Sequence, residues 1–466
     1  MTLRVFVFVF SSLITSIGAA QQQEATMLTF EEYLGYVKYY HPYVKQANLL
    51  LEEGQAKLMK ARGAFDPKLE VDYDKKEFKN STYFNKLNSS FKIPTWFGIE
   101  IKGGLAENSG EYLNPELTVP DNGLYNVGVS IPLARDLLTN KRMATLRKSK
   151  IYNQQVVAER QLLVNSIISE ASMAYFKWLK AYREQQIYTT FLDNAAERLN
   201  GIKKNFELGE NPAIDTLEAG IIYKNRKLAL ERARIMFVKS TLEVSNFLWL
   251  DNNIPVELQP EVHPDLNTFN NVDQVLYTSQ LDIESTNLDN HPKIKILENK
   301  YQIQQIEKRL KRNNLLPQID LEYNFLTEDI QVLNTLNTVN YKTGLKVNFP
   351  LFLRKERGDL KLADLKLNNI AYDKMSTSLN LKNKLDAVNN EISSFNTQQD
   401  LTTNIVSDYT RLLTAEERKF ELGESSLFLI NSRESKLIEA KLKAVKIENE
   451  SLNTKASLFE LINTVE

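Results

Sequence analysis

Phe206-Glu207-Leu208-Gly209-Glu210 recurs unchanged as Phe420-Glu421-Leu422-Gly423-Glu424, 214 residues further along the chain. Closer to the N-terminus, His41-Pro42 returns as His291-Pro292, 250 residues later. Landmarks that recur in the same order and at similar offsets indicate an internal duplication, which dictates the fold more strongly than any local pattern. We therefore expect two copies of one structural unit, over residues 21–260 and 261–466.

Residues 1–20 have the order of a secretory signal peptide. Arg4 precedes an apolar run from Val5 to Ile14, and small residues at Gly18-Ala19-Ala20 follow. About ten apolar residues are too few for a membrane-spanning helix, which needs roughly 20. We expect cleavage after Ala20, and the alternative is a buried N-terminal strand.

The composition argues against several classes of function. The 466 residues include no cysteine, which excludes disulfides, thiolate metal sites and a thiol nucleophile. A net charge of −1 offers no basic footprint for nucleic acid. Two of the 3 histidines simply precede the duplicated prolines, and no catalytic triad, metal cluster or dinucleotide fingerprint is present. We expect neither an enzyme nor a cofactor site.

Long coiled-coil helices are expected in both units. From Ile167 to Phe206, apolar or small residues recur at alternating spacings of four and three, broken only by Gln185, which is the heptad signature. Residues 135–208 contain no proline and only one glycine, which predicts a helix of about 110 Å. A return helix over 212–250 follows, and the second unit repeats the pair over 353–422 and 425–464.

Between the short and long helices the apolar period changes to two, which is typical of strands. Leu69, Val71 and Tyr73 alternate with acidic residues. About ten residues per strand, with aromatic residues near the ends, fit a membrane-spanning sheet, although a soluble half-buried hairpin gives the same alternation. We expect one strand pair within 68–133 and one within 318–350.

The first strand region is 32 residues longer than its counterpart, because the landmark offset has fallen from 250 to 218 where Ile131-Pro132-Leu133 returns as Phe349-Pro350-Leu351. Alternation at Phe97, Ile99 and Ile101 makes a further strand pair the alternative to a long loop. Four strands cannot close a membrane barrel, whose smallest examples have about eight. The chain is therefore expected to form a symmetric oligomer.

The order of signal peptide, helix, two strands, long helix, sharp turn and return helix, with all but the first repeated, resembles the TolC-like outer membrane efflux proteins. The likeness runs from about Leu28 to the C-terminus. It rests on the two His-Pro pairs, the two strand exits, the two Phe-Glu-Leu-Gly-Glu turns, and Thr29 with Glu32, which form a capping box. The resemblance implies a mainly α fold with a membrane β-barrel: a homotrimer whose 12 strands form one barrel, continued by a periplasmic α-helical coiled-coil barrel.

The resemblance also implies a function, location and partners. Such a protein would be the outer membrane channel of a tripartite efflux or type I secretion system. It would be a passive exit duct, surrounded by outer membrane lipid and fed by an inner membrane pump through a periplasmic adaptor, with no cofactor and no nucleic acid. The alternative is a structural periplasmic coiled-coil or interaction protein without a pore.

The turns between long and return helices would lie at the periplasmic tip, where the gate and the adaptor docking surface are expected. Asp215, six residues after Gly209, matches the family's tip aspartate. In the second unit Leu429 and Ser432 replace the family's acidic residues. Arg433 and Glu434 are the candidates to make the contacts between helices there instead, and the alternative is that they are solvated surface charges. We hypothesise a latch between Asp215 and Arg433. The expected tip residues are Gly209, Glu210, Asp215, Glu218, Gly423, Glu424, Arg433 and Glu434.

Overall fold

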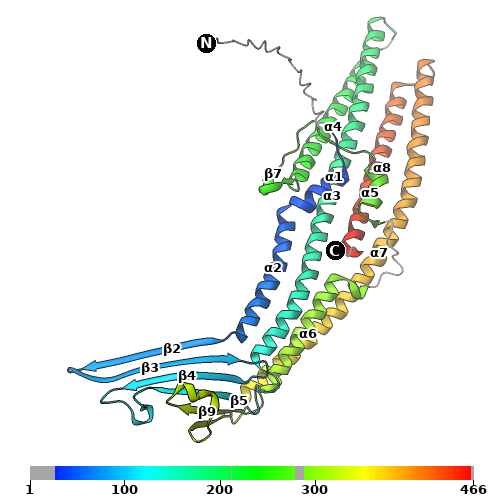
Figure 1. The fold of residues 1–466 in the computed structure, drawn as a ribbon. Coiled ribbons are helices and arrows are strands. Elements are labelled where there is room, and N and C mark those ends of the chain that lie inside the picture. Colours follow the sequence, from blue (N-terminus) through cyan, green and yellow to red (C-terminus); the bar gives the residue numbers. More distant parts are fainter. Residues whose placement is uncertain (1–26, 211, 279–287, 463–466) are drawn as a thin grey trace, which may run out of the picture.

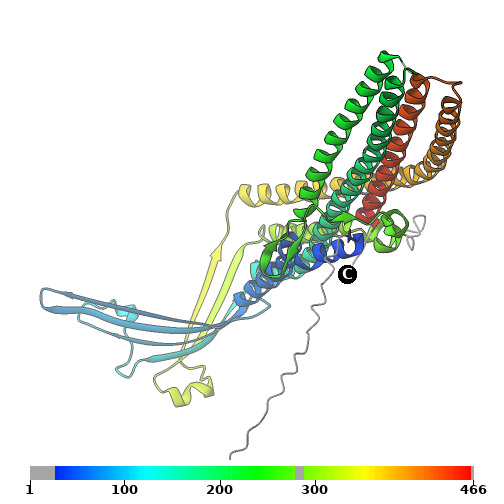
Figure 2. The same ribbon diagram turned by 90° about the horizontal axis from the view of Figure 1, so that it is seen from above.

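The computed structural model describes residues 27–210, 212–278 and 288–462. The expected signal peptide at residues 1–20 and the last two residues of the helix expected over 425–464 lie outside the described residues. The described chain is a long, curved assembly of helices with a β-sheet at one end (Figure 1). Figure 2 shows that the sheet itself is curved.

Two helices run most of the length of the molecule: α3 (Lys141–Glu207) and α7 (Arg354–Glu421). At 1.5 Å per residue, each is about 100 Å long. Each packs against a shorter preceding helix, α2 (Pro42–Arg62) or α6 (Pro292–Asn313), and further along against a return helix, α4 (Ala213–Ser245) or α8 (Leu427–Ile462) (Figure 1). Across the described ranges, no helix combines the length and the apolar character that crossing a bilayer requires.

Short elements surround the middle of the helical assembly, where the largest apolar core lies. α1 (Phe30–Tyr40) begins with the expected capping box: the Thr29 hydroxyl accepts from the amide of Glu32, whose carboxylate accepts from the amide of Thr29. The core includes Phe30, Tyr175 and Trp178, all buried. The other short elements of this region are β1 (Met27–Leu28), β6 (Trp249–Leu250), β7 (Ile254–Pro255), β8 (His263–Pro264), α5 (Thr268–Val275) and 3-10 helices at Asp251–Asn253 and Leu288–Asn290. Three further 3-10 helices belong to the sheet end of the chain: Gly63–Phe65 before the first strand, and Pro115–Leu117 and Ile330–Thr335 between strands.

The duplicated His-Pro pairs are helix starts. His41 is the N-cap of α2 and His291 that of α6, and a proline occupies the first helical position of both helices. The Nδ1 atom of His41 accepts from the amide of Tyr43 (3.3 Å), and that of His291 accepts from the amide of Lys293 (3.1 Å). Both imidazoles must therefore carry no proton on Nδ1 to act as caps.

The His291 cap should make folding sensitive to acid. Burial, assisted by Lys293, lowers the pKa of His291 to about 4, against about 6.5 in an unfolded chain. Between these values the unfolded chain binds a proton that the folded chain does not, so stability should fall as pH drops from 6.5 to about 4 and then level off. Unfolding in urea across this pH range measures the slope. His291→Asn, which caps without titrating, should flatten it; an unchanged slope would assign it to other groups.

The expectation of four strands is wrong, because the sheet has six. It is antiparallel throughout, in the order β10-β9-β5-β4-β3-β2, and β5 pairs with β9 to join the two units. The longer first strand region contributes the extra pair. The strands are β2 (Lys68–Phe78), β3 (Ser81–Pro94), β4 (Glu100–Ser109), β5 (Leu124–Pro132), β9 (Gln318–Thr327) and β10 (Tyr341–Asn348).

The first long helix begins six residues later than expected, at Lys141 rather than at 135. Asn140 is its N-cap, and the Asn140 side chain accepts from the amide of Met143 (2.8 Å). Asp136 has a positive φ of 72°, a backbone conformation that a helix cannot contain. The prediction, which relied on the absence of proline and glycine from this stretch, therefore made the helix too long at its N-terminal end.

Candidate functional site

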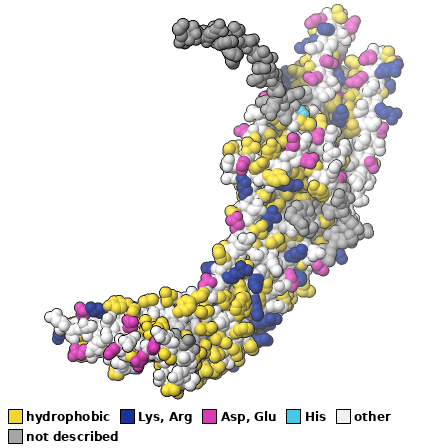
Figure 3. Space-filling view, viewed as in Figure 1, with side chains coloured by type: hydrophobic (Ala, Val, Ile, Leu, Met, Phe, Trp, Pro, Cys, Tyr) yellow, Lys and Arg dark blue, Asp and Glu magenta, His cyan; other side chains and the backbone are white. Residues whose placement is uncertain are grey.

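The sheet has one apolar and one polar face. On the apolar face Ile101 of β4 lies opposite both Ile93 of β3 and Val129 of β5, and Val129 lies opposite Tyr323 of β9. Figure 3 shows hydrophobic side chains gathered over the sheet. The pairing places on the same face Leu69, Val71, Tyr73, Leu87, Phe91, Leu105, Tyr125, Val127, Ile131, Ile319, Leu321, Phe325, Tyr341, Leu345 and Val347.

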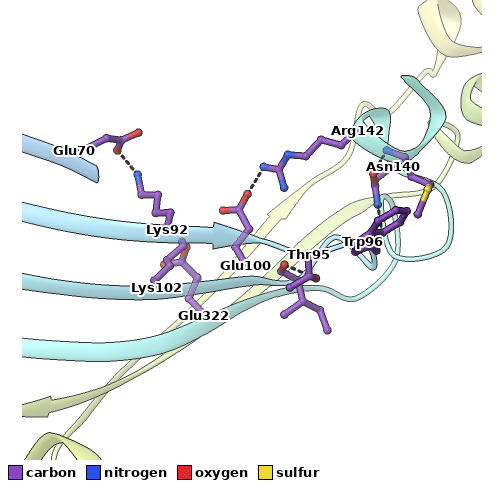
Figure 4. Close-up of polar contacts among 11 residues, drawn as sticks. Glu70, Lys92, Thr95, Trp96, Glu100, Lys102, Asn140, Arg142 and Glu322 are labelled. Atoms are coloured by element: carbon purple, nitrogen blue, oxygen red, sulfur yellow. Dashed lines mark hydrogen bonds and ion pairs between the residues drawn. The ribbon is translucent and has the colours of Figure 1, made fainter. Parts of the chain in front are cut away.

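Ion pairs organise the polar face (Figure 4). The ammonium of Lys102 on β4 lies 2.5 Å from the carboxylate of Glu322 on β9, so this pair spans the intervening β5. Lys102 is paired in the ladder with Gly128, which has no side chain to block the span. Lys92 of β3 contacts Glu70 of the adjacent strand β2. One face of the sheet is thus suited to water and the other to lipid.

The turn between β3 and β4 is fastened to the start of α3. The Thr95 amide and hydroxyl both donate to the carbonyl of Ile99, at 2.9 and 2.7 Å, which closes the turn. The Asn140 amide group donates to the Trp96 carbonyl at 3.2 Å (Figure 4). Arg142, in the first turn of α3, contacts Glu100 of β4. The strand pair that the sequence left open is therefore locked to the helical part at the same end as the other strands.

At the opposite end of the molecule, the two Phe-Glu-Leu-Gly-Glu segments end the long helices in the same way. Gly209 and Gly423 have positive φ values of 80° and 77°. The amides of Glu210 and Glu424 reach back to the carbonyls of Asn205 (2.9 Å) and Lys419 (2.8 Å), the six-to-one bond of a Schellman motif. The identical sequences therefore code identical sharp turns.

Alanine at Gly423 is expected to destabilise the turn. The left-handed conformation costs an L-residue about 1–2 kcal/mol, although a Cβ there would meet nothing within 4 Å. Gly423→Ala should lower the free energy of unfolding by that amount in urea melts of the solubilised protein. The control is Gly201→Ala, inside α3 and equally uncrowded, which should raise stability by about 0.5–1 kcal/mol. Equal effects would rule out the conformational explanation.

A buried carboxylate joins the two units near the tip. Glu434 of α8 has 0% of its side chain exposed and lies between two guanidinium groups, 3.1 Å from Arg198 of α3 and 3.3 Å from Arg226 of α4. Arg198 also donates to Asn431 (3.3 Å), which in turn donates to Glu218 (3.2 Å). This set of residues, Glu218, Asn431 and Glu434 with Arg198 and Arg226, is called the tip network below.

The other predicted tip residues are placed differently. Arg433 lies 3.6 Å from Glu416, on α7 of its own unit. The expected latch between Arg433 and Asp215 stays a prediction. Ser425 donates to Glu416 (2.6 Å), and this hydrogen bond, with help from Arg433, lowers the pKa of that carboxyl. Asp215 stands in the first turn of α4. Glu210 and Glu424 are exposed at the turns.

Arg198 and Arg226 were not predicted, although the sequence carries a signal for them. Arg226 lies seven residues after Ala219 and seven before Ala233, and both alanines are buried. Arg198 likewise stands at helical spacing from the buried Ala195 and Ile202. A charged residue at a buried position of a heptad needs a buried partner of opposite charge. That rule would have linked the arginines to an acidic residue on another helix.

The sequence model of the outer membrane efflux protein family matches residues 283–464. These residues belong to that family. No curated protein sequence matches the chain. Among solved structures, the CmeC outer membrane channel of Campylobacter jejuni superposes with a TM-score of 0.65 at 14% identity, over 92% of this chain and 84% of CmeC. VceC of Vibrio cholerae gives 0.63 at 12%, over 93% and 96%, and the open MtrE channel of Neisseria gonorrhoeae gives 0.61 at 13%, over 93% and 88%.

The family match and the shared fold agree on the architecture. The chain is mainly helical and has the fold of outer membrane efflux channels over nearly its whole described length. Residues 283–464 match the outer membrane efflux protein family, and the rest of the chain shares the fold of these channels. The predicted family is therefore confirmed for residues 283–464, and this match agrees with the predicted outer membrane location and supports a role in efflux.

Proposed function

We propose that this protein is the outer membrane channel of a tripartite efflux or type I secretion system. It is a passive exit duct, assembled as a homotrimer and fed by an inner membrane pump through a periplasmic adaptor. The observation that carries the proposal is one sheet with segregated polar and apolar faces, joined directly to helices about 100 Å long. The polar face lines a water-filled exit, and the helices continue the duct.

The gate and the adaptor docking surface lie at the tip, around Gly209, Glu210, Asp215, Glu218, Gly423, Glu424, Arg433 and Glu434. Two sets of contacts support closure there: the tip network between units, and Arg433 with Glu416 within the second unit. Contacts of about 1 kcal/mol each are enough to change the closed population severalfold. Leu208 and Leu422 are 74% and 68% exposed beside the turns, which offers the adaptor an apolar surface.

Single-channel recording in planar bilayers tests the gate. Arg433→Ala removes the pair with Glu416 at the tip and should raise the conductance of the purified protein while its assembly stays intact. Arg411→Ala is the matched control, because Arg411 is an 82% exposed arginine on the neighbouring helix α7. It should leave conductance unchanged. Equal conductance in both variants would remove Arg433 from the gate.

The alternative, a structural coiled-coil protein without a pore, predicts a different set of results. It would show no conductance in any variant, and it would leave the membrane fraction after salt and carbonate washing. A channel should remain with outer membranes and conduct. Loss of export from cells lacking the protein, restored by the wild-type chain, would tie the conductance to efflux.

A further inference from the structure

The two edges of the sheet are unpaired within the described chain. β2 and β10 are the edge strands, and both are exposed along their whole lengths. Because direction alternates across an antiparallel sheet of six strands, β2 and β10 run in opposite directions. We propose that β2 of one chain pairs with β10 of the next, so that three chains close a ring of 18 strands instead of 12. The proposal rests on the trimer of the proposed function.

The extra strands belong to the wall rather than to a loop outside it. Phe91 of β3 lies opposite Leu69 of β2, and Ile101 of β4 lies opposite Val129 of β5, so apolar pairs connect β3 and β4 to the strands on both sides of them. Their turn is held by Asn140 at the helix end of the sheet. A hairpin lying outside a ring would need neither these apolar pairs nor this anchor.

The pairing also fixes how the sheet slants. Moving straight across it through paired residues leads, in turn, through Lys68, Lys92, Lys102, Gly128, Asn324 and Lys342. Lys68 is the first residue of β2, at the helix end, but Lys342 lies six residues from that end of β10, which is Asn348. The sheet is therefore staggered by about six residues per chain.

A ring whose rim is level puts Lys68 opposite Asn348 of the neighbouring chain. The stagger of the ring then equals its number of strands, and a rise of about 3.3 Å per residue against a strand spacing of about 4.7 Å gives a tilt of about 35°. This value lies within the range of known barrels. The slant already present in one chain is thus the slant that closure by three chains requires.

Side chains match across the edge in this register. On the apolar face Leu69 meets Val347 and Val71 meets Leu345. On the polar face the acidic residues of β2 meet the lysines of β10: Glu70 faces Lys346 and Asp74 faces Lys342. Opposite charges directly across a strand pair stabilise it, and a slip by one residue would mix the two faces.

The consequence is a wide outer opening. Barrel diameter grows roughly in proportion to strand number, so 18 strands give a ring about half as wide again as 12, and barrels of 16–18 strands hold an open aqueous channel. Any narrow point must then lie in the helical part. The outer opening would accommodate bulky solutes without discriminating among them.

Engineered cysteines decide which strand meets β10, and the absence of natural cysteine leaves no background. In the 18-strand ring Val347 faces Leu69 of the next chain. β2 joins the sheet only through β3, so a 12-strand ring that keeps the observed pairing would leave out β2 and β3. In that ring β10 would meet β4, and Val347 would face Ile101. The test therefore compares Leu69→Cys with Val347→Cys against Ile101→Cys with Val347→Cys, after mild oxidation in membranes, on non-reducing gels. Residues directly opposite in a ladder have a Cα separation that a disulfide can bridge.

We expect covalent trimers from the Leu69 pair and none from the Ile101 pair. Covalent trimers from the Ile101 pair, or none from the Leu69 pair, overturn the 18-strand ring. The mass of the Val347→Cys protein in detergent separates this outcome from failure of the proposed function. A trimeric mass without the Leu69 link overturns the ring alone, and a monomeric mass overturns the assembled channel as well.

Discussion

Glu434→Gln is expected to lower the free energy of unfolding by about 3–5 kcal/mol, the cost of breaking a buried ion pair from one side. The Glu434 carboxylate has no exposed surface and lies between Arg198 and Arg226. Glutamine keeps the shape but leaves two largely buried guanidinium groups facing each other without the carboxylate. Urea unfolding of the detergent-solubilised protein, followed by circular dichroism, measures the loss.

Two comparisons separate charge burial from helix effects. Glu439→Gln removes an exposed pair with Lys436 on the same helix and should leave the unfolding transition unchanged. Replacing the triad together, as Glu434→Leu, Arg198→Leu and Arg226→Met, should restore most of the loss, because an apolar cluster of similar volume carries no desolvation cost. If Glu434→Gln behaves like Glu439→Gln, the tip network does not hold the units together.

The duplication made much of the helical fold predictable. His-Pro marked the helix starts because an imidazole cap and a proline at the first position are both local devices. Phe-Glu-Leu-Gly-Glu marked the tip turns because a Schellman motif needs glycine at one position. Local hydrogen bonds of this kind depend on only a few neighbouring residues. Each motif alone is a weak signal, and its recurrence in the second unit made the prediction specific.

The extra strand pair was harder to predict because its alternation is weak. On the apolar face of β3, Asn85 and Ser89 interrupt Leu87 and Phe91, and Gly103 interrupts β4. Such a strand is defined by its neighbours on both sides rather than by its own sequence. The register of the six-stranded sheet, set by pairing between distant segments, shows that β3 belongs to the same apolar face.

The candidate site was also predictable only in part, because its contacts join distant segments of the chain. The sequence named Glu434 and Glu218, but Arg198, which pairs with Glu434, lies 236 residues from it along the chain. The contact of Arg433 with Glu416 of its own unit was likewise not predicted. Which charged residues meet depends on the rotation and offset of four packed helices, and no local pattern specifies these.

A positive charge on the apolar face of the sheet should prevent stable insertion. Val129→Lys is expected to cost about 2–4 kcal/mol, the penalty for lysine on the lipid face near the midplane of a membrane sheet. Val129 sits in a central strand, between Ile101 and Tyr323. The measurement is the urea dependence of folding into lipid vesicles, read from the mobility of folded and unfolded bands on unheated gels.

The matched control is the next residue along the same strand. Ser130→Lys introduces the same side chain on the polar face, where Ser130 lies opposite both Glu100 and Glu322. The new ammonium would stay in water beside two carboxylates, so its effect should be small or slightly favourable. A large difference in stability between the two lysine variants is the result expected if the apolar face contacts lipid. If both lysines were tolerated equally, the apolar face would be in contact with water or protein, and the assignment of this sheet to the membrane would have to be abandoned.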